Sequence, residues 1–158
     1  MGSYTVGLAL LDAIPVLFFG GSMLLVAQMF GYKLFMVGAV IAFVGGALQA
    51  LWKLFLGWKK KDIPILHLLF PPALAIGFML MMLGLLFGRE LLNFPAMLAA
   101  VTGMPSLLLF IVGVVGLFVM AYLSKKLDRN SPKQNWIAPT VNAVAEACIF
   151  FGLLLIRL

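Results

Sequence analysis

The sequence predicts an all-α, polytopic membrane protein: a bundle of five transmembrane helices with one short interfacial helix. The chain has 158 residues, of which 65% are hydrophobic and 10% charged, whereas soluble domains carry roughly one-quarter charged residues. Its apolar runs reach the ~20 residues that a helix needs to cross a bilayer. They lack the strict alternation of barrel strands, so helices are the expected spanning element.

The five expected spans form a single transmembrane domain. They cover residues 4–30, 34–56, 63–87, 105–123 and 137–156. The third span is expected to break near its start at Pro71-Pro72, because each proline removes a backbone donor. Between the third and fourth spans, Asn93 is placed to cap a short helix over residues 94–101. We interpret this helix as interfacial, with a re-entrant segment as the alternative.

The second span carries a stripe of small residues at intervals of four. Its members are Gly38, Ala42, Gly46 and Ala50. Such a stripe lets another backbone approach closely. The approaching helix belongs either to the same chain or to a second copy in a homodimer, and we expect the second span to be central.

The basic residues predict the orientation of the chain. The second and fourth loops hold seven Lys and Arg residues, whereas the other two loops hold only Lys33 and Arg89. The three tryptophans, Trp52, Trp58 and Trp136, fall at the boundary beside the basic loops. The positive-inside bias and the aromatic belt then predict an inner or plasma membrane protein with a cytoplasmic N-terminus and an external C-terminus.

Polar side chains gather in the cytoplasmic half of the expected spans. Counted from the aromatic boundary, Asp12, Gln49 and Glu146 should share one layer at a depth of roughly 12–15 Å. Asn142 and His67 lie nearer the cytoplasm. The asymmetry predicts a polar pocket that opens to the cytoplasm.

The two carboxylates in this layer need neutralisation. An ionised acid at that depth is costly, so Asp12 and Glu146 should each be protonated, paired or hydrated. The candidate partners are His67 and Lys53, although we expect Lys53 to extend toward the membrane boundary at Trp58. If the two acids are close together, they share a proton as a coupled pair.

These residues predict that the protein binds or transports a small solute, a cation or a proton. The candidate ligand-binding residues are Asp12, Glu146, Asn142, Gln49 and His67. The first alternative is a non-catalytic membrane subunit or assembly partner, in which the same side chains hydrogen-bond between helices. The second is a membrane enzyme based on the two carboxylates. Because five helices are few for a self-contained transporter, we expect a homo-oligomer or a membrane partner subunit.

The sequence lacks the residues that metal, haem and phosphate sites require. The chain has one His and one Cys, which form neither a metal site nor a bis-histidine haem site, and it has no phosphate-binding glycine loop. We therefore predict no cofactor, no metal and no assigned catalytic residue. The net charge of +6 comes from the ends of the apolar runs, so we do not expect a nucleic-acid partner; the expected partner is the lipid bilayer.

In size and number of spans the chain resembles the tryptophan-rich sensory protein family, also called the translocator protein family. Members of that family are rich in tryptophan and carry Trp-Pro motifs. Here none of Trp52, Trp58 and Trp136 stands beside a proline. The resemblance therefore implies no activity and no site residue.

Overall fold

The computed structural model describes residues 5–59, 63–127 and 136–157. The helices are α1 (Val6–Phe30), α2 (Lys33–Lys59), α3 (Pro64–Phe87), the 3-10 helix η1 (Arg89–Leu91), α4 (Phe94–Thr102), α5 (Ser106–Lys126) and α6 (Ile137–Arg157). Five of these, α1, α2, α3, α5 and α6, are long and apolar enough to cross a membrane. The predicted all-helical class and the five long helices are confirmed.

Helix α3 differs from its expected form. It is continuous from Pro64 to Phe87 and contains both Pro71 and Pro72, so the expected break at the proline pair is wrong. A proline in a helix removes one hydrogen bond and crowds the preceding turn. Beyond the proline pair, α3 packs closely against α2 at Ala73, Gly77 and Gly84.

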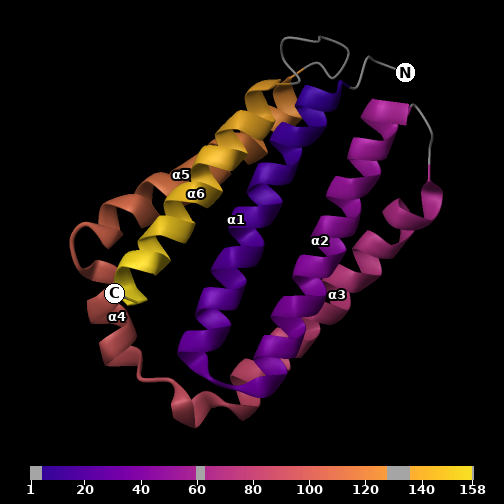
Figure 1. Ribbon diagram of the computed structural model, residues 1–158. Coiled ribbons are helices and arrows are strands. Elements are labelled where there is room, and N and C mark those ends of the chain that lie inside the picture. Colours follow the sequence, from indigo (N-terminus) through magenta and orange to yellow (C-terminus); the bar gives the residue numbers. More distant parts are fainter. Residues whose placement is uncertain (1–4, 60–62, 128–135, 158) are drawn as a thin grey trace.

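The five long helices form a row in the order α3, α2, α1, α6 and α5, as their contacts and Figure 1 show. Helix α1 lies in the middle of this row, with α2 on one side and α6 on the other. The second span was expected to be central; instead α2 has a neighbour on each side but is not the middle helix.

The small residues of α2 bring α3 into backbone contact. A Cβ atom on Gly38 would lie 2.6 Å from the carbonyl oxygen of Gly77, and one on Gly77 would lie 2.7 Å from the backbone nitrogen of Ala42. Further along the stripe, a Cβ atom on Gly46 would contact the side chain of Val16 of α1. The stripe therefore serves contacts within the chain, on both sides of α2.

Glycines also fit α1 and α5 against their neighbours. The ring of Phe43 from α2 covers Gly20 of α1, and the ring of Phe150 from α6 reaches Gly21 on the same helix. At the far end of the row, a Cβ on Gly113 of α5 would clash with Ile149 of α6. The fit of bulky side chains against glycines, more than polar contacts between helices, therefore positions the helices in the row.

Apart from Asp12, Lys53 and Glu146, the charged residues in the described part of the chain lie near the two ends of the row. Lys59 ends α2 and Lys126 ends α5, and both lie at the end that holds the start of α1 (Figure 1). Lys33 and Arg89 lie at the opposite end, where α6 also ends. Lys125 also belongs to the last turn of α5. Residues 60–62 and 128–135, which contain the other four basic residues of the two loops, are outside the described part of the chain.

The turn between α1 and α2 depends on one glycine. Gly31 has φ 71° and donates its backbone N–H to the carbonyl of Ala27, which is the left-handed cap that favours glycine. We expect Gly31→Ala to cost roughly 1 kcal/mol of unfolding free energy, because a Cβ is disfavoured in this conformation. Chemical denaturation measures the loss, and Gly103→Ala, at φ −65°, is a matched control that should change stability less.

Helix α4 forms where the sequence placed a short helix. The side chain of Asn93 accepts a hydrogen bond of 3.2 Å from the backbone N–H of Ala96, as an N-cap does. The helix runs from Phe94 to Thr102 and crosses the end of the row beside the end of α6 (Figure 1). Its neighbours are α5 and α6.

Candidate functional site

Asp12 forms an ion pair with Lys53 across the interface of α1 and α2. The Lys53 Nζ and Asp12 Oδ2 atoms are 2.8 Å apart, and the side chains are 28% and 16% exposed, respectively. Lys53 was expected to extend toward Trp58, and this was wrong. The ammonium group of Lys59 lies over the Trp58 ring instead, 5.6 Å from its centre.

The register of α1 and α2 explains this pairing. Val16 packs on Gly46 and the backbone of Thr5 approaches Gly57, so Asp12 lies level with Ala50, less than a turn from Lys53. A lysine side chain is long enough to bridge that offset. Because the desolvation of a carboxylate is costly, an adjacent cation is its natural partner.

Glu146 has a different environment. It lies in the middle of α6 and is part-buried. Among the described residues it makes no hydrogen bond and no ion pair, and the salt bridge they contain joins Lys53 to Asp12. Asn142, one turn earlier on the same face, is also part-buried. Within the described part of the chain, Glu146 is thus a carboxylate without a counter-ion in an apolar helix.

The structure does not bring Asp12 and Glu146 together. Helix α6 runs parallel to α1, as two contacts at the same spacing show: Trp136 lies against Gly7, and Phe150 lies against Gly21. This register puts Glu146 level with Leu17, about 7 Å further along the helix axis than Asp12. Asp12 also belongs to the flank of α1 that contacts α2, whereas α6 contacts another flank.

The remaining two predicted site residues belong to α2 and α3. Gln49 is part-buried. It lies one turn after Gly45, which packs against Ala73 of α3. It is level with the α1 residue Ala13, so Gln49 and Asp12 do share a depth. His67 belongs to α3, but its side chain is outside the part of the chain that the structure describes.

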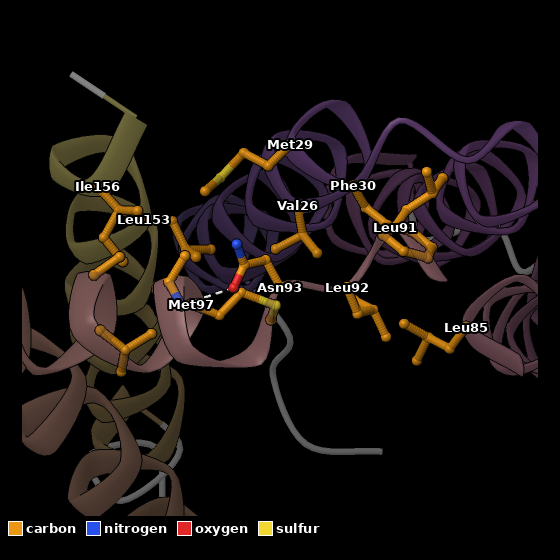
Figure 2. A pocket seen from close by; sticks show the side chains of 13 residues that line it. Val26, Met29, Phe30, Leu85, Leu91, Leu92, Asn93, Met97, Leu153 and Ile156 are labelled. Carbon is orange, nitrogen blue, oxygen red and sulfur yellow. Dashed lines mark hydrogen bonds between the residues drawn. The ribbon is translucent and has the colours of Figure 1, made fainter. Parts of the chain in front are cut away.

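An apolar cavity of about 270 Å³ lies at the opposite end of the row from Asp12 (Figure 2). It opens between the ends of α1 and α6 and the short helix α4. Its wall includes Val26 and Met29 of α1, Met97 and Ala100 of α4, and Leu153 and Ile156 of α6. Sequence reasoning missed this cavity, since it predicted a polar pocket near the other end.

The cavity and the polar residues share faces of α1 and α6. Leu153 lies seven residues, or nearly two turns, after Glu146, so both point to similar sides of α6. On α1, Val26 lies fourteen residues, or nearly four turns, after Asp12. On α6, Glu146 and the cavity-lining Leu153 therefore share a face, nearly two turns apart.

Among residues 5–59, 63–127 and 136–157, no three His, Cys, Asp or Glu side chains gather as a metal site would require. The chemistry that these residues offer is therefore that of one ion pair, one carboxylate with an amide neighbour, and one apolar cavity. Comparison with models of protein families, with curated proteins and with solved structures finds no match.

Proposed function

We propose that the protein is a multi-pass membrane protein that binds a proton or a small cation at Glu146. The membrane location is supported by the five long apolar helices and by the large apolar side chains that they expose, such as Leu17, Met82 and Phe118. Surfaces of this kind are unfavourable in water over so large an area. The basic residues at the end that holds the start of α1 favour a cytoplasmic N-terminus.

The observation that carries the binding proposal is that no residue in the described part of the chain pairs with Glu146. An acid inside a membrane-spanning helix is stable when it carries a proton or meets a cation. Asp12 already has such a cation in Lys53, whereas Glu146 has none among the described residues. Asn142 adds an amide oxygen one turn away, which is a suitable second ligand for a cation.

The proposed site lies on the face of α6 that carries Glu146 and Asn142. Because Asp12 is neutralised, we do not assign it as a ligand, and it serves instead to hold α1 against α2. The two-carboxylate enzyme is not proposed for the same reason. Gln49 and His67 belong to the α2–α3 part of the row, so Glu146 and Asn142 form the minimal site.

Thermal unfolding of the purified protein in detergent tests the site, with methylammonium as the small cation that is added. A ligand at about 100 times its dissociation constant stabilises the folded state by about 2.7 kcal/mol. For a chain of this size that corresponds to an increase in midpoint of roughly 5–10 °C. We expect this increase in the wild type and its loss in Glu146→Gln.

Glu90→Gln is the matched control, because Glu90 is an exposed carboxylate in η1 at the other end of the row. It should keep the full response to the cation. An equal response in Glu146→Gln and the wild type would contradict cation binding at Glu146. Protonation is then tested by infrared spectroscopy, in which the carbonyl band of a protonated acid should be present in the wild type and absent in Glu146→Gln.

The alternative is a non-catalytic subunit in which a second protein neutralises Glu146. The open ends of the row favour it, since α3 and α5 each contact one long helix and expose apolar faces. In that case the isolated protein responds to no cation. Glu146→Gln then weakens copurification of the partner while the isolated chain keeps its stability.

A further inference from the structure

We propose that the cavity between α1, α4 and α6 holds one acyl chain of an anionic membrane phospholipid. This site lies at the other end of the row from Asp12 and does not involve Glu146. It shares only the membrane location with the function proposed above. The argument rests on the size of the cavity, its lining, its position and the polar groups around it.

The size and lining of the cavity suit a hydrocarbon chain. A volume of about 270 Å³ is just below the range of ~300–1,000 Å³ that is typical of sites for drug-sized ligands. Part of one chain fits such a space, whereas a whole phospholipid does not. Every lining residue except Asn93 is apolar, so a polar solute would lose its hydration without finding partners.

The position of the cavity gives a chain access from the bilayer. Helix α1 ends at Phe30, which lines the cavity, and α6 ends just beyond Ile156 on the opposite wall. If the long helices span the membrane, this end of the row lies at one membrane boundary. Helix α4 covers the cavity there and is exposed along most of its length, as an interfacial helix is.

The polar groups at this end favour a lipid head group that is anionic and rich in acceptors. The Asn93 oxygen caps α4 through Ala96, which leaves the amide N–H groups to donate. Figure 2 shows the amide nitrogen of Asn93 directed toward the space between α1 and α6. Phosphate and ester oxygens are acceptors, so they match this donor.

Charge at the same end points to an anionic lipid. Arg89 is exposed two residues before Leu91, and Lys33 is exposed three residues after Phe30, and both Leu91 and Phe30 line the cavity. One acid, Glu90, is also exposed there, so among the described side chains at this end the two cations outnumber it. Basic side chains at a membrane boundary attract anionic head groups.

Photolabelling tests this proposal. The protein is reconstituted with phosphatidylglycerol that carries a diazirine in one acyl chain, irradiated, and digested with trypsin for mass spectrometry. We expect labelled residues within α4, between Phe94 and Thr102. Ala100→Phe fills the cavity from the α4 wall, and it should lower this labelling by about tenfold, the loss expected when about two methylene groups are no longer buried.

Ala99→Phe is the matched control. Ala99 is exposed and is not among the residues that line the cavity, so this variant should label like the wild type. A second variant, Ala96→Leu, fills the cavity with a smaller side chain should Ala100→Phe fail to fold. Circular dichroism and gel filtration show that each variant is folded.

Three outcomes would overturn the proposal. Unchanged α4 labelling in the folded cavity-filling variants means that no chain occupies the cavity. Equal labelling by phosphatidylcholine with the same diazirine chain removes the preference for an anionic head group, and stronger labelling by the free diazirine fatty acid assigns the site to that ligand instead. Because these variants leave Glu146 unchanged, the results are independent of the cation experiment.

Discussion

Gly77→Leu is expected to separate α2 from α3 and to lower the unfolding free energy by about 4 kcal/mol or more. A Cβ on Gly77 would lie 2.7 Å from the backbone nitrogen of Ala42 and 2.8 Å from the carbonyl oxygen of Gly38. Because these atoms belong to the backbone, no side-chain rotation relieves the clash. Unfolding by dodecyl sulfate in mixed micelles, followed by circular dichroism, measures the loss.

Ala75→Leu is the matched control for this prediction, since Ala75 is an exposed residue of the same helix. Added apolar volume on an exposed face should change stability by no more than about 0.5 kcal/mol. Gly77→Ala should fall between the two, because one methyl group already meets the backbone of α2. If Gly77→Leu is as stable as Ala75→Leu, the close contact of α2 and α3 is wrong.

Asp12→Leu is expected to cost about 2–3 kcal/mol. Removing one partner of a buried ion pair costs about 3–5 kcal/mol, because the other charge remains in an apolar environment. The cost is lower here because Lys53 is 28% exposed and its ammonium group can turn toward water. The same micelle unfolding experiment measures the change.

The double variant Asp12→Leu, Lys53→Leu distinguishes an ion pair from simple packing. It removes both charges, so it should recover most of the lost stability. Lys59→Leu removes an exposed cation of the same helix and should have little effect. If the double variant is less stable than Asp12→Leu alone, the pairing of Asp12 with Lys53 does not account for the loss.

These predictions also separate the roles of the two intramembrane acids. Asp12→Leu should reduce stability whether or not a cation is present, since its partner is a lysine of the same chain. Glu146→Gln should leave the unliganded stability nearly unchanged, since an amide replaces an acid that has no partner among the described residues. The acids therefore differ in role even though the sequence placed them in one layer.

The sequence by itself determined the local features. A run of about 20 apolar residues specifies a long helix wherever it lies in the chain, and the five long helices have bounds close to those expected. Asn93 specifies the start of α4, because a cap acts within one turn. These features depend on neighbouring residues, and so they needed no knowledge of the fold.

Only the tertiary structure decided which helices are neighbours and how each is placed along its partner. Lys53 and Asp12 are 41 residues apart in the chain, and their pairing depends on the register of α1 and α2. The contacts of Gly7 with Trp136 and of Gly21 with Phe150 move Glu146 away from the level of Asp12. The cavity arises because α4 packs across the ends of two helices that are far apart in sequence. The position of each helix along its neighbour is set by close packing between glycines and bulky side chains that are distant in the sequence. Counting residues from a predicted membrane boundary therefore cannot predict which side chains lie at the same level.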